Sequence, residues 1–373
     1  MNKKSECCGC SACFTVCPVG AVKMQEDEEG FLYPVIDREK CINCGSCDDI
    51  CNFKKALNEY KGTILKCYGA RLKDRDILEK SSSGGVFTAL SDIFIESGNM
   101  VLCSAYDIFL HEIRFRLIYN KDDRNSARGS VYLQSTVGKI WNEAFEVLKN
   151  HSEKKLLFIG TGCQADGFLA LAEKKNMRDR ILICDMVCHG VPSTKIWKEY
   201  MCLLEKKYGK IKYISFRDKR NGWEKPYAFA KTEEEEISLK PFKRLYVSNC
   251  MMRQSCNVCP YTTIERKSDM TLGDFWHLKE RLPQYYDILG TSLVLIHTQK
   301  GIEFFEKIKS YLEWFSCEKE DCLQKNLLSP TPVSDKREKF MKLYKKGGIE
   351  LLLKRFGRKS IFRALVSAIK KRK

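Results

Sequence analysis

Two cysteine-rich frames within the first 58 residues constrain the fold of this chain more than any other feature. Each frame spaces its cysteines by two, two and three intervening residues, and the frame that starts at Cys7 recurs 34 residues later at Cys41. Three thiolates at this spacing can wrap one face of a 4Fe–4S cubane, while the fourth is turned toward a neighbouring cluster. The frames therefore predict two 4Fe–4S clusters with crossed ligands, one held by Cys7, Cys10, Cys13 and Cys51, and the other by Cys17, Cys41, Cys44 and Cys47.

A zinc ribbon is the structural alternative, because it also uses Cys-x2-Cys pairs. A ribbon needs only four cysteines per ion and exchanges no fourth ligand between frames. Eight cysteines in two identical frames therefore favour a ferredoxin-like domain over residues 1–58. Pro18 follows the last cysteine of the first frame, whereas Asn52 takes that place in the second. Two adjacent clusters pass single electrons, so the domain needs an electron donor and an electron acceptor.

The cysteine content and the N-terminal residues predict a reducing, cytoplasmic location. The chain has 20 cysteines among 373 residues, and its first residues, MNKKSECCGC, contain no apolar segment of a signal peptide. No apolar run approaches the length of a membrane span. Because disulfides are rare in the cytoplasm, these cysteines are expected to bind clusters or metals, in an organism that lives anaerobically.

The net charge of +17 is concentrated at the C-terminal end. Residues 336–373 contain fifteen Lys or Arg against two Glu, so the rest of the chain is nearly neutral. This distribution speaks against a nucleic-acid groove in the core. An apolar i, i+4 stripe over residues 361–369 predicts a basic helix with three alternative roles. It lies on the inner face of an anionic membrane, docks on an acidic partner, or covers its own domain.

Hydrophobic periodicity predicts a mixed α/β or α+β core behind the ferredoxin-like domain. Residues 86–98 and 136–150 have helical periodicity, and a further helix follows the glycine turn at 160–162. Helices alternate with strand-like runs, and the last 40 or so residues are expected to form a peripheral helical tail. The predicted strands are 63–72, 100–107, 111–119, 155–160, 181–190, 212–218, 227–232, 269–276 and 290–298.

Seven ordered segments between Ser81 and Trp276 give the core a specific resemblance. They are SSSGGVFTAL, GSVYLQS, LLFIGTGCQADG, DMVCHGVPS, FRDKRNGW, RQSCNVCPY and SDMTLGDFW. This series resembles the coenzyme F420 hydrogenase/dehydrogenase beta-subunit family, including its bacterial members fused to a ferredoxin domain. The resemblance implies a core that binds FAD and one 4Fe–4S cluster and transfers electrons between the cluster and a hydride-accepting substrate. Val131, Gly162 and His277 depart from the family pattern.

Four cysteines inside these segments are candidates for the third cluster. Cys163 and Cys188 follow strand ends, and Cys256 and Cys259 form a Cys-x2-Cys pair. Because the ends of neighbouring strands converge on one edge of a sheet, the four thiolates can meet there. The resemblance implies that they hold a 4Fe–4S cluster; burial as small apolar side chains is the alternative. The remaining cysteines outside the frames are expected to be structural.

Two loops are candidates for flavin contact. Residues 81–85 precede a helix whose amide groups and dipole favour a phosphate, and a serine-capped linker is the alternative. Residues 129–135 are the second loop, and the resemblance points to the flavin for both. The candidate FAD contacts are Ser83, Gly84, Gly85, Gly129, Ser130, Tyr132, Gln134 and Ser135.

Two further features allow competing interpretations. Residues 160–165 match the dinucleotide pattern G-x-G-x-x-A, with Asp185 at the place of a ribose-binding acid, which predicts nicotinamide binding as an alternative. His189 follows Cys188 and is the candidate proton donor to a reduced substrate, with a structural hydrogen bond as the alternative role. Residues 217–219 offer charge near the site or pair with one another.

Together these features predict an iron–sulfur flavoprotein oxidoreductase. It exchanges electrons with a redox partner protein, either a ferredoxin or a catalytic subunit, and reduces an unidentified organic substrate through FAD. The alternative is a non-catalytic electron-carrier subunit of a larger oligomeric complex. The predicted organisation is a ferredoxin-like domain over 1–58, two parts of the flavin-binding core over 59–150 and 151–330, and a basic helical tail over 331–373.

Overall fold

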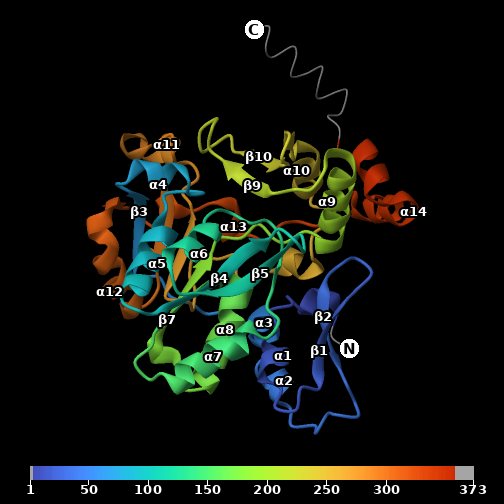
Figure 1. Cartoon of the computed structure of the whole chain (residues 1–373). Helices are drawn as coiled ribbons and strands as arrows, with labels where there is room; N and C mark the ends of the chain where they lie inside the picture. Colours follow the sequence, from blue (N-terminus) through green and yellow to red (C-terminus); the bar gives the residue numbers. More distant parts are fainter. Residues whose placement is uncertain (1–2, 358–373) are drawn as a thin grey trace.

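In the computed structural model, which describes residues 3–357, a nine-stranded mixed sheet is flanked by helices and joined by two smaller units (Figure 1). The predicted mixed α/β class is therefore confirmed. The strands are β1 Val22–Glu26, β2 Leu32–Ile36, β3 Lys66–Leu72, β4 Met100–Asp107, β5 Glu112–Ile118, β6 Ser135–Thr136, β7 Leu156–Thr161, β8 Ile181–Met186, β9 Tyr213–Asp218, β10 Tyr227–Lys231, β11 Glu236–Ser238, β12 Met270–Asp274, β13 Ser292–Ile296 and β14 Leu312–Ser316.

Most of the helices cover the faces of the large sheet or surround its edge (Figure 1). The α-helices are α1 Ala12–Val16, α2 Ser46–Asp49, α3 Asn52–Asn58, α4 Arg75–Glu79, α5 Val86–Glu96, α6 Lys121–Ser126, α7 Ile140–Asn150, α8 Gly162–Lys174, α9 Thr194–Tyr208, α10 Lys240–Val247, α11 Leu278–Arg281, α12 Gln299–Ile308, α13 Lys325–Leu328 and α14 Arg337–Arg355.

The large sheet has the order β14-β3-β13-β12-β8-β7-β4-β5-β6, and β12, β8, β7 and β4 run parallel at its centre. These four strands are almost continuously apolar, as expected for strands buried on both faces. Successive side chains point to opposite faces. In β7, Leu157 and Ile159 pack in one core with α5 and α12, whereas Leu156 and Phe158 pack in another core with α7 and α8.

The parallel strands bring their C-terminal ends to one edge of the large sheet. Thr161 of β7 and Met186 of β8 are paired in register, and β12 ends beside them at Asp274. A second lobe lies against this edge and is formed by the antiparallel sheet β11-β10-β9 with α9, α10 and α14 (Figure 1). Ligands of open α/β sheets bind at this end of the strands, so the fold places a site between the two lobes.

The ferredoxin-like domain is the β1–β2 hairpin with α1, α2 and α3, and it packs on α8 of the core (Figure 1). Asn52 takes the place of the proline that commonly follows the last cysteine of a frame. Its side-chain amide donates a hydrogen bond to Asp166 Oδ1 of α8, at 3.2 Å. Asn142 Nδ2 of α7 similarly donates to the carbonyl of Thr15, at 3.1 Å. The domain is thus anchored to the core through both of these helices.

The C-terminal segment differs from its prediction. The sequence predicts a peripheral tail, but Phe340 and Leu352 of α14 are fully buried in the same core as α9 and α10. The helical path is interrupted at Gly347 and Gly348, where Gly348 has a φ of 56° that favours glycine. Residues 358–373, with the apolar stripe at 361–369, lie outside the described residues. None of the helices within residues 3–357 has the length and apolarity needed to cross a membrane.

Candidate functional site

The cysteines of the two frames lie in two crossed groups. Cys17 lines one small cavity together with Cys41, Cys44 and Cys47, which we call the outer set. The inner set consists of Cys51 from the second frame and the first three cysteines of the first frame. Burial raises the pKa of the Cys13 thiol, and the charges of the neighbouring Cys10, Cys7 and Cys51 raise it further. In each set, the fourth cysteine of one frame thus lies with the first three cysteines of the other frame, which is the grouping that crossed ligation needs.

The two sets differ in their surroundings. Cys44 of the outer set is exposed, and Ile42 beside it is 61% exposed. In the inner set, Cys10 packs against α8 at Gly167, where an added Cβ atom would lie 2.9 Å from Cys10 Sγ. A glycine at this position lets the inner set approach the core closely. The outer set therefore faces solvent, while the inner set adjoins the core.

The four cysteines of the core form a third group, the core set. Cys163 lies in the first turn of α8, Cys188 follows β8, and Cys256 and Cys259 lie in and directly after the short 3-10 segment Gln254–Val258. Burial raises the pKa of Cys188 to about 12 and that of Cys256 to about 11, and charges of neighbouring cysteine thiols contribute to both shifts. Four thiolates crowded into a buried space repel one another unless a cationic group neutralises them.

This donor set fits an iron–sulfur cluster by its chemistry. Thiolates are the preferred ligands of 4Fe–4S clusters, and each thiolate of a cubane binds a different iron atom. Within residues 3–357, no three side chains of His, Cys, Asp or Glu are arranged to hold one metal ion directly. The twelve cysteines of the three sets are those that the sequence singles out as ligands.

Cys8 lies between the inner set and the core set, although its sequence context predicts no role for it. Its side chain is buried in one apolar cluster with Phe53 and Tyr261, and Cys10 and Cys163 pack against that cluster. Hydrogen bonding to Cys10 and then to Cys163 raises the pKa of Cys8. The only sequence signal is its position next to Cys7. The structure shows that the thiols of two separate sets meet at this residue.

A cavity of about 550 Å³ lies between the edge of the large sheet and the second lobe. This volume is within the range of small-molecule and cofactor sites. Cys188 of the core set lines the cavity, and so does His189. Five of the eight candidate flavin residues also line it, namely Ser83, Gly85, Gly129, Ser130 and Tyr132.

The other three candidate residues make internal contacts instead. The Gly84 amide donates to Ser292 Oγ at 2.9 Å, and the Ser135 and Ser104 hydroxyl oxygens are 2.6 Å apart. Gln134 Nε2 donates to the carbonyl of Cys8 at 2.8 Å. None of the three is among the residues that line the cavity. Gln134 therefore connects the ferredoxin-like domain to the core.

Several residues that line the cavity also carry a buried polar atom without a protein partner among the described residues. Such atoms are costly unless a ligand or water bonds to them. They include both hydrogen-bond donors and acceptors, which suits an organic ligand with phosphate, hydroxyl and ring groups. The cavity-lining residues that carry them are Ser82 (Oγ), Thr88 (Oγ1), Arg128 (Nε), Arg217 (Nε) and Gln324 (Oε1).

The charged residues 217–219 do not pair with one another. Arg217 is paired with Asp274 at the end of β12, and Asp218 is paired with Arg220 at 2.7 Å. Lys219 Nζ donates to the carbonyl oxygens of Leu78 and Ser83, both at 2.8 Å. Lys219 thereby ties the end of β9 to the loop that precedes α5 and holds one wall of the cavity.

His189 and Asp185 both have structural partners. His189 Nε2 lies 2.9 Å from Asn249 Oδ1, and the His189 carbonyl accepts a hydrogen bond from the Thr331 hydroxyl at 2.5 Å. Asp185 is 2% exposed, accepts a hydrogen bond from Thr271 Oγ1 at 2.5 Å and pairs with Arg266 at 3.4 Å. Asp185 is thus engaged inside the sheet, and this disfavours the nicotinamide interpretation of the glycine turn.

Comparison with known proteins gives two family matches. Residues 153–319 match the family described as the C terminus of the beta subunit of coenzyme F420 hydrogenase/dehydrogenase, and residues 6–55 match the 4Fe–4S dicluster domain. A subunit of the F420H2 dehydrogenase of Methanosarcina mazei is 24% identical over 329 residues, which are 82% of this chain and 83% of that protein.

Two further similarities cover different parts of the chain. One protein of the anaerobic dimethyl sulfoxide reductase of Escherichia coli is 41% identical over 63 residues, which are 17% of this chain and 29% of that protein. A polypeptide of the F420-reducing NiFe hydrogenase complex from Methanosarcina barkeri matches with a TM-score of 0.47 and 20% identity. That match covers 79% of this chain and 92% of the other.

Proposed function

We propose that this chain, which joins a 4Fe–4S dicluster domain to a domain of the coenzyme F420 hydrogenase/dehydrogenase beta-subunit family, conducts electrons between a partner protein and an organic substrate. The chain is an iron–sulfur electron-transfer protein of the oxidoreductase type. The partner would meet it at the outer cysteine set, and the substrate would bind in the cavity. The relative from Methanosarcina mazei, a dehydrogenase subunit, supports this assignment.

The observation that carries the proposal is the continuous order of the three cysteine sets and the cavity. The outer set faces solvent at Cys44, and it shares the ferredoxin-like domain with the inner set. The inner set touches α8 at Gly167, and Cys8 lies between it and Cys163 of the core set. Cys188 of the core set in turn lines the cavity. Electron transfer needs such a series of closely packed sites.

The proposed cofactors are three 4Fe–4S clusters, one for each cysteine set, and FAD in the cavity. When bound, clusters carry single electrons and a flavin exchanges electron pairs as hydride. Ser82 in the loop before α5, Thr88 in its first turn, and Arg128 would bond the polar groups of the flavin. Tyr132 and Tyr246, both half-buried residues that line the cavity, would help to exclude water.

The partner-facing surface is proposed from the exposure around the outer set. Val19 and Ile42 line the same small cavity as the outer cysteines and are 41% and 61% exposed. Apolar side chains around an exposed redox site suit transient docking of another redox protein, either a ferredoxin or a catalytic subunit. The basic C-terminal residues would add contact with an acidic partner or with the inner face of a membrane.

Substitution at the cavity wall tests flavin binding separately from cluster binding. Ser82→Trp would place a large side chain in the wall of the cavity, and Ser97→Trp, at the exposed C-terminal end of α5, is the matched control. After anaerobic purification, FAD and iron per chain are measured for both. The proposal expects Ser82→Trp to lose FAD and keep its iron, with Ser97→Trp unchanged. Full FAD content in Ser82→Trp would refute the cavity assignment.

The second candidate function is a non-catalytic carrier subunit, which the relatives that belong to multi-subunit redox enzymes favour. The two functions differ in what the isolated chain does. If the chain is an enzyme, the purified protein oxidises or reduces a deazaflavin or another organic acceptor when supplied with electrons. If the chain, with its cofactors bound, exchanges electrons only when a catalytic subunit is added, the carrier function would be established.

A further inference from the structure

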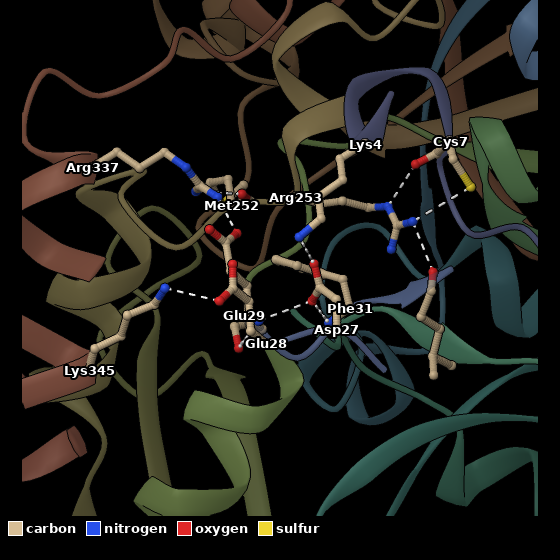
Figure 2. Close-up of polar contacts among 12 residues, drawn as sticks. Lys4, Cys7, Asp27, Glu28, Glu29, Phe31, Met252, Arg253, Arg337 and Lys345 are labelled. Carbon is tan, nitrogen blue, oxygen red and sulfur yellow. Dashed lines mark hydrogen bonds and ion pairs between the residues drawn. The ribbon is translucent and has the colours of Figure 1, made fainter. Parts of the chain in front are cut away.

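Arg253 joins the ferredoxin-like domain to the core in a buried position (Figure 2). It precedes the 3-10 segment that carries Cys256, and its side chain is 1% exposed. Nε donates to the carbonyl of Cys7 at 3.0 Å, and one terminal nitrogen donates to the carbonyl of Leu32 at 2.9 Å and approaches Cys7 Sγ at 3.8 Å. The other nitrogen donates to Gln134 Oε1 at 3.0 Å.

The charge of Arg253 is not balanced by a carboxylate, unlike that of other buried arginines in the described part of the chain. Arg266, which is equally buried, pairs with Asp185 at 3.4 Å. Arg124 pairs with Asp92 at 2.9 Å. The acceptors of the four hydrogen bonds of Arg253 are two carbonyls, one amide and the sulfur of Cys7. Only the sulfur can carry a negative charge.

An unpaired buried cation is strongly unfavourable, so an anionic group is expected next to it. Arginine is the least able of all side chains to lose its charge. The guanidinium also stacks over Tyr33, whose ring centre is 4.2 Å away, and this contact does not remove the charge. Among the hydrogen-bond partners of Arg253, only the sulfur of Cys7, which belongs to the inner set, can supply this anion.

We propose that Arg253 is the counter-charge of the inner cluster, raising its reduction potential above that of the outer cluster while fixing the ferredoxin-like domain on the core. This inference rests on the proposed function, since it requires a cluster at the inner set. Reduction adds one negative charge to a cluster without forming a bond. A buried cation stabilises the reduced form, because net charge and hydrogen bonds to sulfur set cluster potentials. Arg253 thus draws a single electron from the outer cluster toward the core.

Arg337 offers a control at the same interface without this charge effect. It pairs with Glu29 of the ferredoxin-like domain and donates to the carbonyls of Met252 at 2.8 Å and Cys250 at 3.0 Å (Figure 2). Lys345 of α14 pairs with Glu28 nearby at 2.9 Å. These contacts also hold the domain on the core, but their charges are paired with carboxylates. Loss of Arg337 therefore weakens docking without unbalancing a charge beside Cys7.

The test is an anaerobic redox titration of the whole chain, followed by EPR. The inner signal is identified as the one lost in Cys13→Ala. For Arg253→Met we expect the ratio of reduced to oxidised inner cluster, at a fixed potential, to fall at least tenfold, which is about 59 mV for one electron. Arg337→Met should change that ratio less than twofold, and Arg253→Lys, which keeps the charge, less than threefold.

An unchanged reduction potential of the inner cluster in Arg253→Met would overturn the inference. A tenfold fall of the ratio of reduced to oxidised inner cluster in Arg253→Lys would also overturn it. If Arg253→Met fails to hold the inner cluster, Arg253→Lys decides alone: a retained potential supports the charge effect, and a tenfold fall refutes it. If the wild type and Cys13→Ala contained the same amount of iron, the proposed function would instead be refuted, because the inner cluster would not exist.

Discussion

Cys17 is the residue that most directly distinguishes crossed from uncrossed ligation. It belongs to the first frame in the sequence but lies in space with Cys41, Cys44 and Cys47. The spacing of the frames predicts this exchange, because the three residues before the fourth cysteine turn it away from its own cluster. The grouping of Cys17 with the cysteines of the second frame therefore depends on the local backbone geometry of short sequence motifs.

Removal of one outer ligand should disturb the outer cluster alone. We expect Cys17→Ser to show the same EPR spectrum and the same loss of iron as Cys44→Ser, because both residues belong to the outer set. Cys202→Ser is the control, since Cys202 is an exposed cysteine of α9 outside all three sets. A Cys17→Ser spectrum that matches Cys13→Ser would show that each frame holds its own cluster.

His297 gives the fold a specific sensitivity to acid. It is buried at the end of β13, with Nδ1 2.7 Å from the Thr63 carbonyl and Nε2 2.8 Å from Thr271 Oγ1. Burial lowers its pKa to about 4. The unfolded chain therefore binds a proton at pH values where the folded chain does not, and stability is lost as the pH falls below about 6.5.

The size of this effect follows from the two pKa values of His297. Between pH 8 and pH 5.5, its contribution to the free energy of unfolding should fall by about 1.4 kcal/mol. Denaturant unfolding of the wild type and His297→Gln at both pH values measures it, because the other titrating groups cancel in the comparison. Equal losses of stability in the two proteins would contradict the assignment.

At the scale of elements, α14 shows where sequence reasoning is incomplete. Its high charge indicates a solvated helix, yet its apolar side packs against α9 and α10. Seven strands of the large sheet were easier to predict, since their burial alternates or is nearly continuous, whereas β6, with two polar residues, and β14, with three exposed residues, were not predicted. The burial of α14 could not be predicted, because it depends on partners that are about 90 or more residues away in the chain.

Truncation of a buried side chain in α14 should therefore destabilise the core. Phe340 is 0% exposed, so Phe340→Ala is expected to lower the free energy of unfolding by about 3–5 kcal/mol. Lys339→Ala, on the exposed side of the same helix, should change it by less than about 0.5 kcal/mol. Denaturant titration of the two variants compares them, and equal stabilities would show that α14 is peripheral after all.

For the whole molecule, the path from the surface to the cavity emerges only from the tertiary structure. The cysteines could be found from their motifs, and Cys163 and Cys188 of the core set lie at strand ends that the periodicity indicates. The cavity is different, because its wall combines residues near positions 81–88, 127–133, 186–191 and 216–247 with the end of β12. Which loop residues face it depends on packing. Gly84 and Gln134, for example, bond to Ser292 and Cys8 instead.

The cofactor content of the native chain tests the central claim most directly. The chain is purified under anaerobic conditions, and iron, acid-labile sulfide and flavin are measured per polypeptide. The three cysteine sets and the cavity predict about twelve irons, about twelve sulfides and one FAD per chain. About eight irons without flavin would contradict the account, since only the ferredoxin-like domain would then carry cofactors and no electron path would reach the cavity.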